Sequence, residues 1–295
     1  SQRYELNVAV SSSLYEYFVG KDHSLRSTFD LGKFVTPYAL KPIADCLWTL
    51  YQDDEDFANG VLMVVHQIPY EASAPQKFPV ETIAENVGDC DLFSFVAASV
   101  MMAGGLDVVL LFYESEMHMN VGVNLSHAPN DARMSATYFS YSGQRYYVAE
   151  TTGGKWETGW RVGECPDSFR GVSAQVVTLE DAEQVSPGQV SASFGVLTGS
   201  SSITLSLSSG FVVEGSSISV YGSVSPVSID GVVTIYVRSS GGNFSWMVLS
   251  KVSCDSGGRY SYDWKPASSG LYYIRASWSG DANHAGADSN VGSVR

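Results

Sequence analysis

The stretch Gly88-Asp89-Cys90-Asp91, which leads directly into the apolar run from Leu92 to Met102, decides how the first half of this chain folds. The run predicts a buried helix, and the pair Gly104-Gly105 that follows it is typical of a helix end. Cys90 is therefore expected in the first turn. Unpaired backbone N–H groups and the helix dipole favour negative charge there, so a thiol at this place is readily converted to a thiolate.

Three helices are expected before Cys90. The first covers Pro37 to Tyr51, where apolar residues recur at helical spacing. The acidic run Asp53–Asp56 fits the N-terminus of the second, because acids there complement the helix dipole. A calcium loop is the alternative interpretation of these acids, but the run lacks the alternating Asp/Asn pattern, the central Gly and the closing Glu of an EF-hand. The third helix is a short one from Val80 to Glu85.

The residues after the Cys90 helix show strand patterns. Val108 to Tyr113 is a continuous apolar run, and residues alternate in character from His118 to Leu125. In the second segment His118, Asn120 and Asn124 share one face, which we expect to line a cleft or face solvent. Tyr138–Tyr141 and Tyr146–Glu150 predict a hairpin around Ser142-Gly143-Gln144-Arg145. Helices followed by an antiparallel sheet predict an α+β fold for this part of the chain.

Cys90, His118 and Glu150 are the candidate catalytic residues. A thiol, an imidazole and a carboxylate can form a set in which the imidazole takes the thiol proton and the acid orients the imidazole. Such chemistry also needs donors for an oxyanion. The Cys90 backbone N–H is one candidate and the Gln67 side chain is a second, although Gln67 can equally cap the end of its own helix. The remaining histidines His66 and His127 have no such pattern around them and are interpreted as structural or surface residues.

These motifs together resemble the transglutaminase-like cysteine peptidases of the papain-like superfamily. The resemblance rests on Gly88-Asp89-Cys90, on His118–Val123 and on Tyr146–Thr152, with flanking similarity at Phe78–Ile83 and Trp160–Pro166. It covers roughly residues 30–170. It implies a Cys–His–acid triad that forms a thioester, which water or an amine then resolves. The family usually has Asp as the third member, and this chain has Glu150.

The chain changes character near residues 186–201, after which it is rich in Ser, Gly and Val. The motifs predict a catalytic domain over residues 1–190, a linker over 191–200 and a second domain over 201–295. Whether residues 1–33 cover the cleft as a lid or pack against it stays open.

About seven short strand candidates predict an immunoglobulin-like β-sandwich in the second domain. Its final segment, Leu271–His284, resembles the closing strands of bacterial Ig-like repeats of surface proteins. Such modules act as spacers or adhesion elements. Trp246, Trp264 and Trp278 are interpreted as core residues, with a sugar-binding platform as the alternative. Asn124-Leu125-Ser126 and Asn243-Phe244-Ser245 fit the glycosylation pattern.

Composition excludes several classes of function. The chain has 295 residues, 17 Lys and Arg, and a net charge of −14, so nucleic acid is not an expected partner. Mean hydropathy is near zero and no apolar run reaches the roughly 18 residues that cross a bilayer. The chain begins without Met, so we expect that processing removed any signal or anchor. Few lysines and many Ser, Gly, Tyr and Trp favour a secreted or cell-surface protein.

The four cysteines are too widely spaced for a CxxC zinc site, and we expect neither a metal ion nor a cofactor. Cys46 and Cys165 can pair, with buried free thiols as the alternative. The leading hypothesis is a cysteine peptidase or amidase that acts at the cell surface on a protein, a peptide or a surface polymer. The alternatives are a transglutaminase-type enzyme that cross-links proteins through amines, and a non-catalytic adhesion or scaffold protein.

Overall fold

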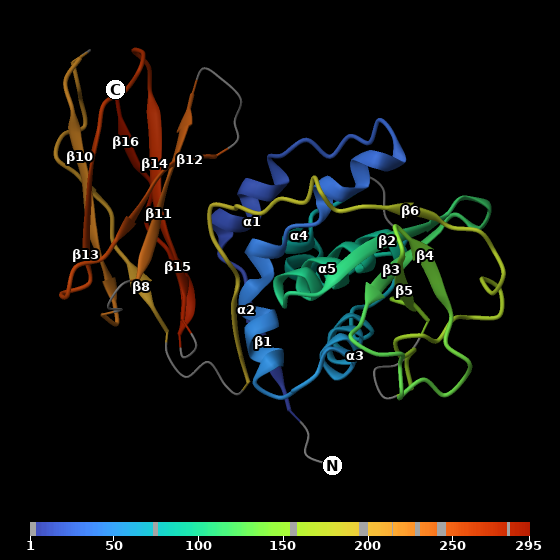
Figure 1. The fold of residues 1–295 in the computed structure, drawn as a ribbon. Coiled ribbons are helices and arrows are strands. Elements are labelled where there is room, and N and C mark those ends of the chain that lie inside the picture. Colours follow the sequence, from blue (N-terminus) through green and yellow to red (C-terminus); the bar gives the residue numbers. More distant parts are fainter. Residues whose placement is uncertain are drawn as a thin grey trace. The chain divides into compact units, whose positions relative to one another are not determined.

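The protein is described by a computed structural model over residues 4–72, 76–153, 158–194, 200–213, 215–227, 231–240, 246–281 and 284–295. The chain forms two compact units, each described by itself below (Figure 1). One unit, Asp22–Ser186, contains helices and a sheet and is called the α+β unit. The other combines Ser1–Lys21 with Pro187–Arg295 and is called the β unit.

The helices of the α+β unit begin where the sequence provides a cap or a proline. A 3-10 turn, η1 (Thr28–Phe34), precedes α2 (Pro37–Trp48), α3 (Asp54–Val65), α4 (Pro79–Glu85) and α5 (Cys90–Ala103). Asp53 caps α3, because its side chain accepts a hydrogen bond of 2.8 Å from the Asp56 N–H. The acidic run is therefore a helix N-terminus, and that prediction is confirmed.

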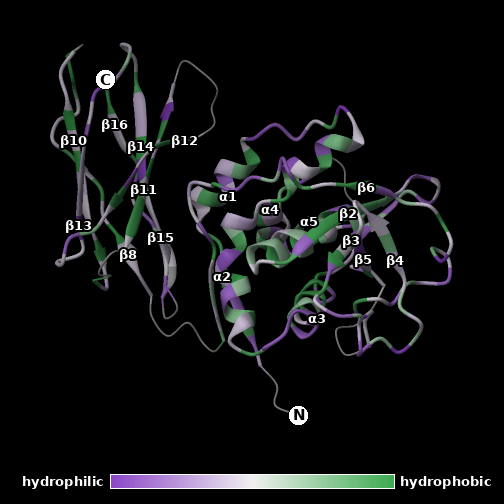
Figure 2. Cartoon of the chain, in the orientation of Figure 1, coloured by the Kyte–Doolittle hydropathy of each residue, from purple (hydrophilic) through white to green (hydrophobic). Residues whose placement is uncertain are grey.

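Helix α5 begins at Cys90 itself. Asp89 is its N-cap and accepts a hydrogen bond of 3.2 Å from the Leu92 N–H. Every residue from Leu92 to Met101 is buried, and Figure 2 shows α5 as largely hydrophobic. The helix packs on strands β2 (Asp107–Tyr113) and β3 (His118–Asn124) (Figure 1). The sequence therefore predicted this helix, the place of Cys90 in its first turn and its burial correctly.

The sheet of the α+β unit has five antiparallel strands in the order β4-β5-β3-β2-β6. A short 3-10 turn, η2 (Glu114–Glu116), joins β2 to β3, and β6 (Gln175–Val177) closes one edge. The predicted hairpin is confirmed as β4 (Tyr138–Tyr141) and β5 (Gln144–Ala149). Its two turn residues, Ser142 and Gly143, both have positive φ, of 48° and 82°. Such turns match the right-handed twist of the paired strands.

Strand β3 is buried on both faces, which corrects the prediction of a polar face toward a cleft or solvent. His118 and Asn120 are 9% and 0% exposed. β3 lies between β5 and β2 in the sheet, and α5 covers part of it. The face that carries His118 and Asn120 has Tyr113 and Leu111 as its cross-strand neighbours. Residues from the later segment around Phe169 pack on this side of the sheet. The sequence of β3 alone does not indicate this contact.

The two larger sheets of the β unit are both antiparallel. One contains β8 (Ser202–Ile203), β9 (Ser206–Leu207), β10 (Ile218–Ser225) and β13 (Arg259–Trp264); the other contains β11 (Val232–Ser239), β12 (Met247–Ser253), β14 (Tyr272–Gly280), β15 (Ala285–Asp288) and β16 (Gly292–Val294). Ile218 and Val220 from the first sheet share one hydrophobic core with Ile235 and Ile274 from the second. The second part of the chain is therefore a β-sandwich, and its Ig-like topology stays a prediction.

The tryptophans of the β unit belong to its interior. Trp246, Trp264 and Trp278 are 5%, 7% and 2% exposed. A sugar platform needs exposed rings, so that alternative is wrong and the core interpretation is confirmed. The predicted sequon at 243–245 lies outside the described residues.

The start of the chain belongs to the β unit, which differs from the predicted domain 1–190. Strand β1 (Leu6–Ala9) pairs with β7 (Ser191–Phe194), so the first residues of the predicted linker form a strand, while residues 195–199 lie outside the described residues. Helix α1 (Ser12–Val19) follows β1, and its Glu16 carboxylate accepts a hydrogen bond of 3.0 Å from Arg275 Nη2. Partners so distant in sequence cannot be read from local patterns.

All four cysteines are free, so Cys46 and Cys165 do not pair and the alternative of free thiols is confirmed. Within the part of the chain that is described, no helix combines the length and the apolar character needed to span a bilayer.

An ion pair fixes the long loops of the α+β unit. Glu164 is fully buried, and its carboxylate accepts hydrogen bonds from the Arg133 N–H, Nε and Nη2 at 2.7, 2.8 and 2.6 Å. The Arg161 N–H donates a fourth at 3.0 Å. Burial alone would raise the pKa of Glu164, but these donors outweigh it and lower the pKa to about 2.

We expect Glu164→Gln to destabilise the α+β unit by about 2 kcal/mol at pH 7, because it removes the charge that these donors stabilise. A lowered pKa means that the contribution of Glu164 is complete above pH 4.5 and is lost as the pH falls toward about 2. Chemical denaturation between pH 7 and pH 3 measures both effects. Glu180→Gln, at an exposed position, is the control and should leave stability unchanged. Equal stability of the two variants would contradict this expectation.

Candidate active site

The predicted acid and base meet inside the α+β unit. His118 is the first residue of β3, and Glu150 directly follows the last residue of β5. Because β3 and β5 are antiparallel neighbours with Val121 opposite Ala149, the start of one strand lies beside the end of the other. His118 Nε2 lies 3.0 Å from Glu150 Oε2 and 3.2 Å from Oε1. The sequence placed these two residues together correctly.

The Glu150 carboxylate is fully buried and surrounded by hydrogen-bond donors. Asn120 Nδ2 donates to it at 3.0 Å, and the Thr152 N–H and hydroxyl donate at 2.9 and 2.7 Å. Burial raises the pKa of Glu150, but the hydrogen bonds from His118, Asn120 and Thr152 outweigh burial and leave the pKa below its ordinary value. Glu150 is therefore an anion at neutral pH.

The anion fixes the tautomer of His118. A carboxylate only accepts hydrogen bonds, so Nε2 of the neutral ring carries the proton and Nδ1 is left as an acceptor. The ring is held flat against Phe169, with centroids 4.3 Å apart and planes 4° from parallel. Its orientation is therefore set at one nitrogen and at one face, while Nδ1 is available to take a proton.

Cys90 lies beside the same strand. As the first residue of α5 its N–H has no partner within the helix. The backbone of Met119, the residue after His118, lowers the pKa of the Cys90 thiol, although burial outweighs this effect. Ser94 ties the helix to this place, because its hydroxyl lies 2.7 Å from the Cys90 carbonyl oxygen and 3.1 Å from that of Met119. Cys90 and His118 are therefore positioned by one helix start and one strand start.

The thiol is held in its protonated form. Cys90 Sγ donates to Asp91 Oδ1 at 3.5 Å, and Gln76 Nε2 donates to the other oxygen of Asp91 at 3.0 Å. Burial and the negative charge of Asp91 raise the pKa of Cys90 to about 12. The Asp91 carboxylate is turned toward the sulfur. Gln76 and Asp91 are thus residues of the site whose roles the sequence did not indicate.

Three further residues were considered in the sequence. Gln67 Nε2 donates to the Met63 carbonyl at 2.9 Å, so its amide caps α3, as in the alternative interpretation, and is not placed for an oxyanion. His66 is more than a surface residue, since its Nε2 lies 3.0 Å from the Glu150 backbone oxygen. His127 is exposed, as expected.

Asp53, Asp54 and His127 offer atoms within 4.8 Å of one another. Oxygens of both acids accept backbone N–H groups, from Asp56 at 2.8 Å and from Ser126 at 2.6 Å. These acids therefore serve as the cap of α3 and as an anchor for the loop after β3.

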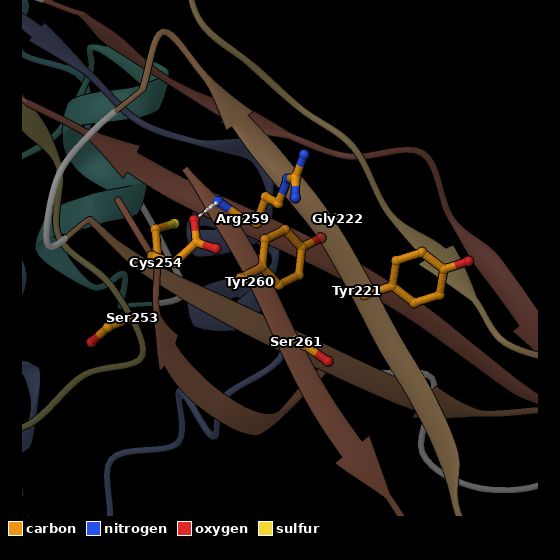
Figure 3. A pocket seen from close by; sticks show the side chains of 8 residues that line it. Tyr221, Gly222, Ser253, Cys254, Arg259, Tyr260 and Ser261 are labelled. Carbon is orange, nitrogen blue, oxygen red and sulfur yellow. Dashed lines mark hydrogen bonds between the residues drawn. The ribbon is translucent and has the colours of Figure 1, made fainter. Parts of the chain in front are cut away.

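Two hollows on the described surface were compared with the site. The larger of these, about 500 Å³, belongs to the β unit and is lined by residues of β10 and β13 and by Ser253–Asp255; Figure 3 shows Tyr221, Arg259 and the free Cys254 along it. It contains none of the predicted site residues. The smaller, about 210 Å³, adjoins the residues that follow Glu150.

No family model and no curated protein matches the chain. Among solved structures, the chain is similar to a proposed cysteine protease from Cytophaga hutchinsonii, with 11% sequence identity and a TM-score of 0.30. The match covers 57% of this chain and 54% of that chain, so it spans about half the length of that structure. The function is therefore argued from the site itself.

We expect Asp91→Asn to make Cys90 more acidic, because it removes a charge next to the sulfur. The thiol pKa should fall, and iodoacetamide labelling near pH 8 should become faster by about tenfold for each pKa unit. The rate is measured by mass spectrometry of the Cys90 peptide across pH 6–10.

Asp89→Asn is the matched control for that experiment. Asn also caps helices well, and Asp89 affects the pKa of Cys90 less than Asp91 does. A shift in Asp89→Asn as large as that in Asp91→Asn, or no shift in either, would contradict the role given to Asp91.

Proposed function

We propose that this protein is a cysteine peptidase or amidase that cleaves a peptide or isopeptide amide through a thioester on Cys90. The observation that carries the proposal is the buried Glu150 carboxylate, which holds Nε2 of His118 while Cys90 begins a helix beside the same strand. An imidazole with one nitrogen held and the other open is what a general base requires.

The proposed reaction begins with the thiol protonated. His118 Nδ1 takes the proton as Cys90 Sγ attacks the carbonyl carbon of the amide, and the electron pair of the carbonyl moves to oxygen. The Cys90 N–H, which has no partner within its helix, is our candidate donor to this oxyanion. When the intermediate collapses, the C–N bond breaks and His118 gives its proton to the leaving amine.

Hydrolysis of the thioester regenerates the site. Water attacks the thioester carbonyl, His118 Nδ1 takes a proton from that water, and the C–S bond breaks. The product leaves as a carboxylic acid and the proton returns to the Cys90 sulfur. Glu150 keeps its charge throughout and stabilises the imidazolium that forms in each half of the cycle.

Proton transfer and attack are coupled in this proposal. A thiol with a pKa of about 12 is not a thiolate at neutral pH, so a preformed thiolate–imidazolium pair is not the resting state. His118 therefore acts as a base during the attack itself. Substrate that displaces Asp91 from the sulfur would lower the cost of this step.

We also propose the finer assignments that the sequence suggests. The α+β unit is taken as a papain- or transglutaminase-like domain and the β-sandwich as an Ig-like module of a secreted or surface-attached protein. Helix α5 with its leading Cys90, packed on an antiparallel sheet that contains His118 at the start of a strand, supports the first assignment. The seven-strand pattern of the sequence supports the second.

We expect Cys90→Ala to lower amide cleavage by roughly three orders of magnitude or more, because no nucleophile remains. Cleavage of a proteome-derived peptide library, together with lysine isopeptides, is followed by mass spectrometry. Cys46→Ala is the matched control, since Cys46 is also a free, partly exposed thiol. Equal cleavage by wild type and Cys90→Ala would overturn the proposal. Adducts with an added primary amine, formed in place of acids, would show transamidation instead.

We expect Glu150→Gln to lower kcat roughly hundredfold to ten-thousandfold with little change in KM, because the neutral amide no longer stabilises the imidazolium. Steady-state kinetics on a cleaved peptide measure both constants. Glu116→Gln, at an exposed acid two residues before His118, is the control. If kcat is unchanged in Glu150→Gln, Glu150 is not the orienting acid.

A further inference from the structure

A small cavity lies near the start of α5, the helix that begins with the proposed nucleophile. Its volume is about 210 Å³, and it is lined by His66, Ile68, Tyr70, Phe93 and the segment Thr151–Gly153. The lining comes from the end of α3 and the loop after it, from α5, and from the loop after β5. None of these residues takes part in the proposed proton transfers, although Thr152 also holds the Glu150 carboxylate.

Three links connect the cavity to Cys90. Phe93 is one turn along α5, three residues from Cys90, and so lies on the same side of the helix. Tyr70 forms a parallel bridge with Gly88, two residues before Cys90. Burial raises the pKa of the Tyr70 hydroxyl, and the carboxylates of Asp89 and Asp91 raise it further, which agrees with a position near the start of α5. A substrate held at Cys90 therefore has a neighbouring part beside this cavity.

The cavity carries no formal charge. Burial lowers the pKa of His66, so its ring is neutral at pH 7, and its Nε2 donates to the Glu150 backbone oxygen. Tyr70 and Phe93 form an edge-to-face pair, with centroids 6.1 Å apart and an interplanar angle of 77°. With Ile68 these rings provide apolar walls. A charged side chain placed here would lose its hydration without gaining a partner.

The size of the cavity limits what it can hold. Pockets for whole small-molecule ligands usually measure about 300–1,000 Å³. A volume of about 210 Å³ is below that range and suits a single amino-acid side chain rather than a complete ligand.

We propose that this cavity is a specificity pocket that takes one compact, uncharged, apolar side chain of the substrate, from a residue next to the cleaved amide. The proposal rests on the proposed function, since it assigns the substrate class of the same site. Tyr70 and Ile68 form the adjustable part of the wall, because both belong to the loop after α3 rather than to a helix or strand.

The test uses a proteome-derived peptide library, so that no single substrate has to be chosen, and reads every cleavage by mass spectrometry. Wild type should show one position near the cleaved bond where compact apolar residues are preferred over Lys, Arg, Asp and Glu. Ile68→Phe fills the cavity and should shift that position toward Gly and Ala by about tenfold in relative kcat/KM, while Ile68→Ala should shift it toward larger residues.

Ile83→Phe is the matched control, because Ile83 is a partly exposed isoleucine of α4 that does not line the cavity. It should leave the preference as in wild type. Iodoacetamide labelling of Cys90 in every variant shows that the site is folded. If wild type cleaves peptides and both Ile68 variants show the same preference as wild type, the cavity is not a specificity pocket. The proposed function would not be affected by that result. Equal cleavage by wild type and Cys90→Ala would overturn both.

Discussion

The buried charge of Glu150 is the constraint on which the rest of the site depends. An ionised carboxylate removed from water costs several kcal/mol unless donors surround it. Here the donors come from two places, His118 and Asn120 on β3 and Thr152 on the loop after β5. A slip of β3 against β5 by one residue would turn His118 and Asn120 to the other face and leave the charge unpaired. The register of the sheet and the orientation of the imidazole are therefore stabilised by the same interaction.

A second carboxylate acts on the thiol. Asp91 favours a protonated Cys90, because its oxygen accepts from the sulfur at 3.5 Å. The helix dipole at the start of α5 favours the thiolate, and burial opposes it. The balance raises the pKa of Cys90 to about 12, so the thiol is protonated at neutral pH. A protonated thiol is less open to oxidation than a thiolate.

Local features of the sequence predicted what depends on neighbours in the chain. The apolar run from Leu92 to Met102 and the glycines after it indicated α5, and the turn Ser142-Gly143-Gln144-Arg145 indicated the hairpin. Contacts that depend on the three-dimensional fold were not predicted. Phe169 lies about fifty residues from the ring on which it stacks, and Asp91 looks like any acid of a first helical turn until the direction of its side chain is known. Cys90, His118 and Glu150 could be proposed from the sequence because a thiol, an imidazole and an acid occur in a known order, whereas the residues that contact them are ordinary ones.

The β unit also depends on a pairing of segments that are far apart in the sequence. β1 and β7 pair with Ala9 opposite Ser191, so the chain completes this unit only after passing through all of the α+β unit. Insertion of one unit into another is tolerated where the ends of the inserted unit are close together, and paired strands on either side provide such ends. The α+β unit is contiguous from residue 22 to 186, and its sheet and helices need no residue from outside that range. The proposed chemistry is therefore contained in the segment that can fold first during synthesis, while the β unit must wait for the end of the chain.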